Sequence, residues 1–408
     1  MTAMSKRSSL SRADMLELRE YETRCVKLTP VEAGELAALT RGSSAVRSQP
    51  RVIEQILPTG EAGLFDVQPG PYVGRFTTGS GLTVDVASRF DFVDLLQVLR
   101  VAARQPTVLT KAPTPARGGR GLVELIATAY VRELHRIAGF GLAKGYVTRT
   151  FTHPPYPGVP DATAHLARHL GRPDRLVTRA RRLTVDIALN QVLAAAHRVL
   201  RHQVYTDGML SVHLRSLTPV LSDVASVPDA RRLALVAGRN VPTRYQEAFG
   251  LAVLVLAGLT TLPSGAGAAG PSVLFNMTKV WEGYVQTLIE ENLPSGNTLS
   301  AQHPVLLTDD PSRIQAAADL VVLGPGLEPL EVYDAKYKPW GTTPSPQEIY
   351  QVHTYAYRLG LKTGILLYPG RGERSEVVVG QYRIHTHGVD VLAPRAVSPG
   401  GTTTAPPG

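Results

Sequence analysis

The sequence predicts a multidomain α+β protein with a β-rich N-terminal part, a helical and basic middle part, and a C-terminal α/β part. Three observations lead to this prediction. The chain has 408 residues, which is more than a single hydrophobic core comfortably holds. Its hydrophobic pattern changes from strand-like to helix-like, and then to alternating helices and strands. Its charge is uneven, with 18 Lys and Arg against 6 Asp and Glu between Arg100 and Arg215.

The composition excludes several classes of protein. Hydrophobic residues make up 43% of the chain and charged residues 19%, as in a soluble globular protein. The single cysteine, Cys25, excludes a disulfide framework and a zinc site built from cysteines. Residues 1–15 lack the apolar run of a secretory signal, and the apolar stretch at 249–263 is too short to span a bilayer. We therefore expect a cytoplasmic protein that binds no membrane.

Two domains are expected before residue 261. A flexible leader at 1–15 precedes a β-rich domain at 16–105, in which GLTVDV alternates like a strand and FVDLLQVLRVAAR returns to helical spacing. Residues 106–260 are expected to be mostly helical, because RRLTVDIALNQVLAAAHRVLRH places an apolar stripe beside exposed arginines. Their positive charge is typical of either a solvated basic face or a surface that binds phosphate. At the other end of the chain, residues 396–408 read as a disordered tail.

The last domain is expected over residues 261–395, after the linker TTLPSGAGAAGPS. It begins with a helix at MTKVWEGYVQTLIEEN, whose apolar residues recur on one face and for which Asn276 is available as a cap. Strands are expected at HPVLL, DLVVL and LEVYDAKYK. A helix opened by Ser345, Pro346 and Glu348 follows, and then strands at TGILLYP and EVVVGQYRI.

The stretch EVYDAKYK carries the most distinctive pattern. Side chains alternate across a strand, so Asp334 and Lys336 point to the same face. If DLVVL pairs with this strand through the GPGLEP turn, Asp319 meets Asp334 at the same end of the sheet. Two converging carboxylates repel one another unless a cation lies between them, which is typical of a divalent-metal site with oxygen ligands. The lysine would then hold water beside the metal and offset charge on a phosphate.

The spacing alone is also compatible with a surface ion pair between Asp334 and Lys336, since an acid-x-Lys triplet is expected about once by chance in such a chain. Further residues favour the metal site. Glu282 lies at the border of the helical stripe, from where it would reach the sheet as a third carboxylate. Gln351 and Tyr355 lie one turn apart on the next helix and face the same way, as residues that contact a DNA backbone would.

These residues, in this order on helix, hairpin and helix, resemble the PD-(D/E)xK nuclease core with the glutamine-tyrosine motif of its RecB-like branch. More specifically, FNMTKVWEGYV, ADLVV, EVYDAKYKPW, EIYQVHTYAYRLG and ILLYPG resemble the McrC family, the nuclease subunits of McrBC-type systems that restrict DNA containing methylcytosine. GLAKGYVTRTFTHPPYPGVPDAT and LTVDIALNQVLAAAHRVL are similar to the middle of that family, and REYET and YVGRFTTGSGLTVDV to its N-terminal strands. The sequence departs from the family at Ala318, where a proline is usual, and at 87–89, where the family has Pro-Lys.

The resemblance implies a C-terminal restriction-endonuclease-like domain with the PD-(D/E)xK core, and a DNA endonuclease that serves phage defence. One or two Mg²⁺ ions would polarise the scissile phosphate. The residues that the resemblance assigns to this site are the catalytic Asp319, Asp334, Lys336 and Glu282, the accessory Gln351 and Tyr355, and, for the metal, Asp319, Asp334, Glu282 and the carbonyl of Ala335.

The resemblance also implies partners. Members of the McrC family act with McrB, an AAA+ GTPase that supplies DNA recognition and translocation and whose GTP hydrolysis they stimulate. The chain itself has no Walker A motif, because GFGLAKGY lacks the Gly-Lys-Ser/Thr ending, so we expect it to bind no nucleotide. The N-terminal and middle domains would contact the GTPase, and the basic middle would contact methylated double-stranded DNA. Two alternatives stay open: a scaffold that activates its partner without cutting DNA, and the same nuclease core coupled to a different NTPase.

Overall fold

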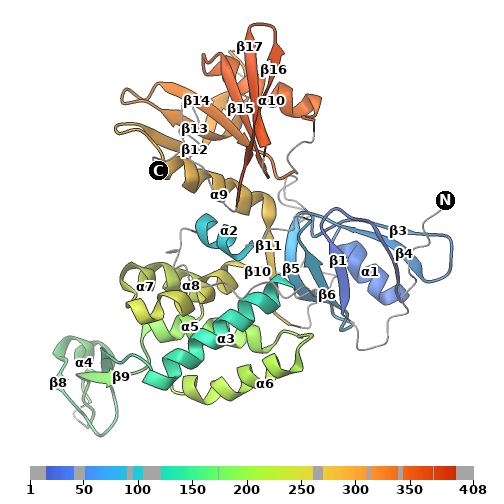
Figure 1. Ribbon diagram of the computed structural model, residues 1–408. Helices are drawn as coiled ribbons and strands as arrows, with labels where there is room; N and C mark the ends of the chain where they lie inside the picture. Colours follow the sequence, from blue (N-terminus) through green and yellow to red (C-terminus); the bar gives the residue numbers. More distant parts are fainter. Residues whose placement is uncertain are drawn as a thin grey trace. The chain divides into compact units, whose positions relative to one another are not determined.

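The protein is a mixed α/β, multidomain molecule (Figure 1). The computed structural model describes residues 15–40, 51–89, 95–103, 121–172, 174–260, 270–309, 314–338, 343–370 and 372–391. The described residues contain four sheets. The chain divides into two compact units, Met1–Val123 with Thr260–Gly408, and Glu124–Leu259. Residues 1–14 of the predicted leader, the whole predicted tail and most of the predicted linker lie outside the described residues.

The first unit starts with two small sheets that share one core. Their elements are β1 (Leu16–Arg19), β2 (Arg24–Lys27), α1 (Pro30–Ala38), β3 (Ile53–Pro58), β4 (Leu64–Pro69), β5 (Tyr72–Thr77) and β6 (Thr83–Ala87). One sheet has the order β2-β4-β3 and the other β1-β6-β5-β11-β10, where β10 is Leu259–Thr260 and β11 is Ser272–Asn276. Strand β11 pairs antiparallel with β5, so a segment from late in the chain completes the N-terminal sheet.

Helix α1 differs from the sequence prediction, which placed only strands and turns in this segment. Its start signals are nevertheless present in the sequence. The Thr29 hydroxyl accepts a hydrogen bond from the amide of Glu32, the Glu32 carboxylate accepts one from the amide of Thr29, and Pro30 occupies the first turn. Ala33 and Leu36 are buried in the shared core. A capping box followed by a short amphipathic run was therefore sufficient to identify this helix.

The same unit contains the C-terminal α/β part. Its elements are α2 (Leu95–Ala102), α9 (Met277–Glu291), β12 (Thr298–Leu306), β13 (Gln315–Leu323), β14 (Pro329–Ala335), α10 (Pro346–Arg358), β15 (Thr363–Pro369), β16 (Gly372–Val379) and β17 (Tyr382–Val389). The six strands form a mixed sheet with the order β12-β13-β14-β15-β17-β16. Strands β14, β15 and β17 are parallel to one another, while β12 and β13 pair antiparallel.

Two expected strands of this sheet end or turn differently. EVVVGQYRI is a hairpin of β16 and β17, because Gly380 adopts a positive φ of 60° that permits the turn. The strand expected over LEVYDAKYK ends at Ala335, and the chain then turns, with the amide of Lys338 donating to the carbonyl of Lys336 at 2.9 Å. Lys336 therefore stands at the exit of β14 instead of inside it.

The second unit is largely helical, as the sequence predicts, and carries one additional sheet. Its elements are α3 (Leu122–Phe140), β7 (Gly145–Phe151), β8 (Val159–Pro160), α4 (Ala162–His169), β9 (Thr178–Thr184), α5 (Ala188–Arg201), α6 (Gly208–Leu217), η1 (Thr218–Leu221), α7 (Ala230–Ala237), η2 (Gly238–Asn240) and α8 (Thr243–Ala257). The sheet has the order β7-β9-β8. The segment RRLT, expected to open the mid-chain helix, ends strand β9 instead.

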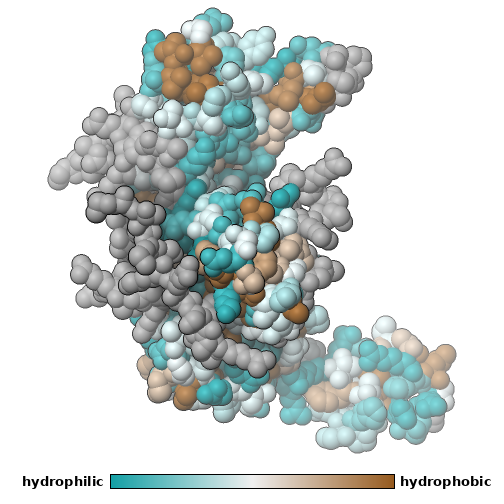
Figure 2. Space-filling view, turned by 90° about the vertical axis from the view of Figure 1, so that its right-hand side faces the viewer, coloured by the Kyte–Doolittle hydropathy of each residue, from teal (hydrophilic) through white to brown (hydrophobic). Residues whose placement is uncertain are grey.

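A buried asparagine explains why the helix begins late. Asn190 in α5 donates to the carbonyls of Ala143 and Val185 at 2.9 and 2.6 Å, and it accepts from the hydroxyl of Tyr245 at 3.1 Å. These bonds hold the chain before α5 in an extended path. No helix in the described part of the chain is long and apolar enough to cross a membrane. On the face shown in Figure 2, hydrophobic residues form only small patches among hydrophilic ones.

Candidate functional site

Asp334 is a fully buried carboxylate at the end of β14. The ammonium of Lys336 lies 2.7 Å from its Oδ2, and its Oδ1 has no hydrogen-bond partner among the described residues. Burial raises the pKa of Asp334 to about 6, although the adjacent Lys336 charge opposes this shift. A buried carboxylate oxygen without a donor is costly unless a cation or donor satisfies it. Asp334 is thus built to meet a positively charged group.

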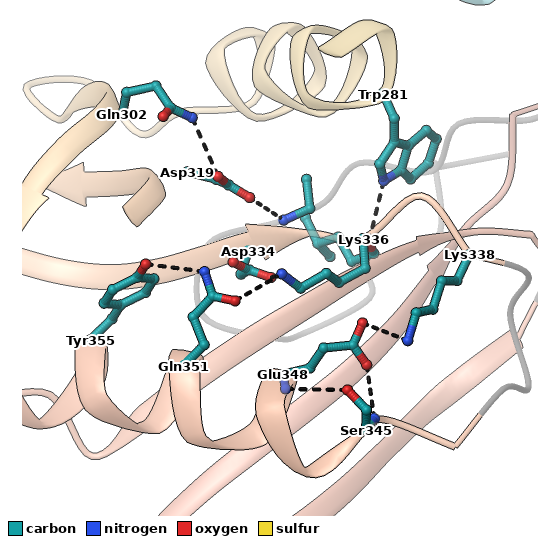
Figure 3. A network of polar contacts seen from close by, with 12 residues as sticks. Trp281, Gln302, Asp319, Asp334, Lys336, Lys338, Ser345, Glu348, Gln351 and Tyr355 are labelled. Atoms are coloured by element: carbon teal, nitrogen blue, oxygen red, sulfur yellow. Dashed lines mark hydrogen bonds and ion pairs between the residues drawn. The ribbon is translucent and has the colours of Figure 1, made fainter. Parts of the chain in front are cut away.

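Asp319 lies next to Asp334 because of the pairing of β13 with β14. Leu320 is opposite Tyr333 in this antiparallel pair, so Asp319 and Asp334 occupy neighbouring positions. The Oδ2 of Asp319 accepts from the amide of Ala335 at 2.9 Å. Its Oδ1 accepts from Gln302 on β12 at 3.3 Å (Figure 3). The charge of Asp319 is one of the causes that raise the pKa of Asp334, so the two carboxylates share one electrostatic environment.

Glu282 approaches this corner from α9, but its carboxylate is engaged elsewhere. Its Oε2 lies 2.6 Å from the ammonium of Lys279, one turn earlier on the helix. Burial raises the pKa of Glu282, and the nearby Asp319 charge raises it further. Among the described residues, no group of three or more His, Cys, Asp or Glu side chains is placed to hold a metal ion. The close carboxylate pair is therefore Asp319 with Asp334, and Glu282 lies within electrostatic range of it.

This pair fits a hard divalent cation. Mg²⁺ is usually bound by one or two carboxylates and completes its shell with water and phosphate oxygens. Asp334 offers an unsatisfied buried oxygen, and Asp319 offers a second carboxylate beside it. Ala335, whose carbonyl the resemblance to the McrC family also assigns to the metal, separates Asp334 from Lys336 at the strand exit.

Lys336 is held by a chain of polar contacts that leads into α10. Its ammonium donates to Oε1 of Gln351 at 3.1 Å, and Nε2 of Gln351 donates to the hydroxyl of Tyr355 at 3.1 Å (Figure 3). Burial lowers the pKa of Lys336, but the carboxylates of Asp334, Asp319 and Glu348 together raise it more, so the net shift is upward. The lysine is therefore a charged donor with a defined direction. The two residues predicted to share a face of the helix do so.

Helix α10 is oriented by its first turn. The hydroxyl of Ser345 accepts from the amide of Glu348, and the carboxylate of Glu348 accepts from the amide of Ser345 at 2.8 Å. The other oxygen of Glu348 lies 2.8 Å from the ammonium of Lys338. This contact ties the start of α10 to the strand exit that carries Lys336. In Figure 3 the strands of the site run between α9 and α10.

Three contributors to the site are missing from the sequence-based prediction. Gln302 binds Asp319 from β12, and Lys338 binds Glu348. The indole of Trp281 donates to the carbonyl of Leu367 at 3.3 Å, the same carbonyl that accepts from the amide of Lys336. The second lysine of DAKYK was a signal for Lys338. Nothing in the local pattern marks Gln302, because its role depends on strand pairing.

Comparison with known proteins places the chain in a family. A family model described as the McrBC 5-methylcytosine restriction system component matches residues 67–369, which is most of the 408 residues and includes every candidate site residue. The chain belongs to the McrBC family. The resemblance to the McrC family found in the sequence is thus confirmed, and the protein is a component of a McrBC-type restriction system.

The fold of this McrBC-family protein is shared with a solved structure. The chain is similar to one in the refined half-complex from a tetradecameric assembly of Thermococcus gammatolerans McrB AAA+ hexamers with bound McrC. The two chains are 14% identical, the match covers 93% of this chain and 95% of the other, and the TM-score is 0.58. A second match, to the cryo-EM structure of the T. gammatolerans McrBC complex, has 14% identity, coverage of 69% and 89%, and a TM-score of 0.43. No curated protein matches the sequence.

Proposed function

We propose that this McrBC-family protein is a Mg²⁺-dependent DNA endonuclease subunit with a PD-(D/E)xK core, and that it acts with a GTPase of the McrB type. The observation that carries the proposal is the geometry at the exit of β14. There, buried Asp334 lies beside Asp319 and within 2.7 Å of the Lys336 ammonium. Two acids on adjacent strands and a lysine at the exit of one of them, backed by a Gln-Tyr pair, have the chemistry needed to hydrolyse a phosphodiester.

The residues of the chain have distinct roles in this reaction. Asp319, Asp334 and the carbonyl of Ala335 would hold the metal, and bound Mg²⁺ would supply Lewis-acid polarisation of the scissile phosphate. The Lys336 ammonium would orient the attacking water and offset the charge that develops on the phosphate. Gln351 fixes the lysine in place, because it accepts a bond from the ammonium at 3.1 Å. Glu282 would act on the same cation from α9, either directly or through water.

The partner follows from the family and from the structural match. The similar T. gammatolerans structure contains McrB AAA+ hexamers with bound McrC. We therefore propose that this chain binds an AAA+ GTPase through residues 16–105 and 106–260, stimulates its GTP hydrolysis, and binds no nucleotide itself. Recognition of methylated DNA would lie with the GTPase, and the nuclease domain would extend over residues 261–395.

The middle unit supplies a surface for the DNA backbone. Residues 124–259 contain 17 Lys and Arg against 9 Asp and Glu, a surplus of eight positive charges. Strand β9 exposes the consecutive Arg181 and Arg182, one on each face of the strand. Arginines on such a surface bind phosphates without reading sequence, and each contact adds to the salt dependence of binding. DNA binding by the complex should therefore weaken steeply as salt increases.

The decisive experiment compares the wild-type complex with Lys336→Ala. The protein is purified with a GTPase of the McrB type from the same organism and incubated with Mg²⁺, GTP and either methylated or unmethylated plasmid. We expect nucleotide-dependent cleavage by the wild type, and a loss of about 10²–10³-fold or more in Lys336→Ala, because a transition-state donor is removed. Stimulation of GTP hydrolysis should be retained. Lys362→Ala, at a lysine beside Tyr382 and outside the site, serves as the matched control.

Other outcomes distinguish the alternatives. The first alternative is a scaffold that activates its partner without cutting DNA. That function would be supported if neither complex cuts either DNA while GTP hydrolysis is still stimulated. Cleavage with ATP but not with GTP would indicate the same nuclease coupled to a different NTPase. Equal cutting by the wild type and Lys336→Ala would contradict the catalytic role of the lysine.

A further inference from the structure

The residue that follows Lys336 is held by the N-terminal sheet. Tyr337 is buried, and its hydroxyl donates to Oε2 of Glu20 at 3.0 Å. The same hydroxyl lies 3.2 Å from Oγ of Ser88. Glu20 and Ser88 directly follow β1 and β6, which are parallel neighbours in the five-stranded sheet. Tyr337, at the exit of β14, is thus hydrogen-bonded to the ends of two strands that lie more than two hundred residues earlier in the sequence.

Arg89 adds contacts to the ring and to the backbone of Tyr337. Its guanidinium carbon lies 4.5 Å from the ring centroid of Tyr21 and 5.0 Å from that of Tyr337, so the cation is placed between two aromatic faces. Its Nη2 donates to the carbonyl of Tyr337, and its amide donates to Oε2 of Glu20 at 3.2 Å. We call Glu20, Tyr21, Ser88 and Arg89 the Tyr337 clamp.

The clamp contains a buried ionisable residue, Glu20, where an apolar residue would also fill the space. Glu20 is fully buried, and burial raises its pKa to about 7. Removing a carboxyl group from water is unfavourable, and the two donors from Tyr337 and Arg89 offset only part of this cost. An apolar side chain of similar size would avoid this cost. A buried acid that aims at one hydroxyl gives this contact a defined geometry instead.

The position held by the clamp affects the candidate catalytic lysine directly. The amide of Lys336 donates to Leu367 at 2.9 Å, after which the chain leaves the sheet and turns. Beyond this bond, Tyr337 is held by the clamp, and Lys338 is held by Glu348 at 2.8 Å. The backbone torsions that direct the Lys336 side chain are therefore set between two anchors, one of which belongs to the N-terminal sheet. A displacement of about 1 Å in a catalytic group can cost a large part of the rate.

We propose that Glu20 and Arg89 are positioning residues, which hold Tyr337 so that the Lys336 ammonium stays directed at Asp334 and Gln351. The N-terminal sheet is in this way mechanically linked to the candidate cleavage site. The effect on cleavage rests on the proposed nuclease function, whereas the hold on the strand exit does not. The two parts are therefore tested by separate measurements.

The first measurement does not depend on cleavage. Hydrogen exchange of the Lys336 and Lys338 amides is followed in the full-length protein with its partner. Arg89→Ala and Glu20→Leu should increase exchange at both amides by about tenfold or more, because the exit loses one anchor. Tyr284→Phe is the matched control, since Tyr284 is a buried tyrosine whose hydroxyl has no partner among the described residues. Unchanged exchange in both clamp variants would overturn the proposal.

The second measurement is the single-turnover rate of DNA cleavage. Glu20→Leu and Tyr337→Phe should each lower the rate constant by about 10–100-fold, as is typical for residues that support a catalytic group, with DNA affinity unchanged. Glu20→Gln should restore most of the rate, because its amide oxygen still accepts from Tyr337. The double variant Glu20→Leu with Tyr337→Phe should lose no more than the worse single variant.

The outcomes separate the two proposals. If the wild-type complex does not cut DNA, the proposed function is wrong. Hydrogen exchange at Lys336 and Lys338 then tests by itself whether the clamp holds the strand exit. If exchange increases but the cleavage rate of the clamp variants equals that of the wild type, the clamp does not position Lys336 and the inference is overturned. Additive losses in the double variant would also overturn it, because they would mean that Glu20 and Tyr337 act independently.

Discussion

At the scale of single residues, neighbouring acids of the candidate site differ in what already binds them. Asp319 accepts from Ala335 and Gln302 and lies beside Asp334, whose Oδ1 has no partner among the described residues, whereas Glu282 is bonded to Lys279. The three carboxylates therefore differ in how free they are to bind a metal ion. This difference leads to an ordered prediction for their neutral variants.

We predict that Asp319→Asn lowers the cleavage rate more than Glu282→Gln. Glu282→Gln should cost about 10–100-fold, the range typical of groups that support a metal site from outside. Asp319→Asn should exceed that loss, because it removes one of the two adjacent carboxylates. The measurement is the single-turnover rate at several Mg²⁺ concentrations. If Glu282→Gln is the more damaging change, the site is centred on α9 and not on the β13–β14 pair.

A second prediction concerns His197, a buried histidine in α5. Burial, helped by the charges of Arg201 and Arg198, lowers its pKa from 6.5 to about 4. The native state therefore keeps it neutral, while the unfolded chain takes up a proton below pH 6.5. The associated stability is complete above this pH and is lost as pH falls toward 4. Between pH 7 and pH 5 the free energy of unfolding should decrease by about 2 kcal/mol through this group.

Urea unfolding at both pH values checks this prediction. His197→Gln cannot take up the proton, so its stability should decrease less between pH 7 and pH 5 than that of the wild type. The imidazole Nε2 lies 3.2 Å from the hydroxyl of Thr218, and glutamine keeps a polar group there. Parallel pH dependences in the two proteins would show that His197 does not titrate as its burial indicates.

At the scale of elements, α10 is positioned by a close approach to β15. A Cβ atom at Gly364 would lie only 2.8 Å from Cγ2 of Val352 and 3.3 Å from its carbonyl oxygen. The helix that carries Gln351 and Tyr355 thus rests on a strand position without a side chain. Because valine is stiff at χ1, it has little freedom to move away from an added methyl group.

We predict that Gly364→Ala lowers the free energy of unfolding by about 1–3 kcal/mol, the range typical of overpacking. It should also slow cleavage by displacing Gln351. Val352→Ala in the same chain should restore part of both losses by making room. Gly34→Ala in α1 is the control, because nothing lies within 4 Å of its added Cβ and the change should be neutral or stabilising. An equal effect of the two substitutions would contradict the close contact.

The capping box of α10 gives a further prediction at this scale. Ser345→Ala removes the side-chain acceptor for the amide of Glu348 and should cost about 1 kcal/mol of stability. The rate of cleavage should fall as well, since Glu348 also anchors Lys338. Thr29→Ala, in the equivalent capping box of α1, should cost a similar stability without altering the rate. Equal rate effects would mean that the first turn of α10 has no special relation to the site.

At the scale of the whole molecule, the chain passes from one compact unit into the other and returns. Residues 124–259 form a continuous unit with its own buried residues, including Leu193, Tyr245 and Leu251. The first unit is discontinuous, because β11 returns after the second unit to pair with β5. A continuous unit with its own core has what independent folding requires.

We predict that a fragment of residues 121–260 folds alone and unfolds in one cooperative transition. The full chain should show two transitions, one of which coincides with that of the fragment. Circular dichroism during urea unfolding measures both. A fragment that lacks a cooperative transition would show that the first unit is required for the second to fold.

Much of the C-terminal part follows from local chemistry. Asn276 and Ser345 cap the two helices that the sequence predicts, and the turn between DLVVL and LEVYDAK gives the predicted neighbouring of Asp319 and Asp334. The sequence prediction was wrong in two segments. In one, strand pairing overrode a local preference for helix, and in the other a local helix signal was overlooked. RRLT joined strand β9 because it pairs with β7, and α1 was overlooked although its capping box is present.

The sequence by itself determined the family, the order of the elements and the spacing of the acids and lysine, because caps, turns and strand alternation act over a few residues. Only the tertiary structure decided which charges share a space. It placed Gln302 on Asp319 and brought Glu20 to Tyr337. Contacts across strands and between distant segments depend on how the strands pair and pack. That packing is set by the burial of hydrophobic residues from the whole chain. No periodicity within a short window contains that information.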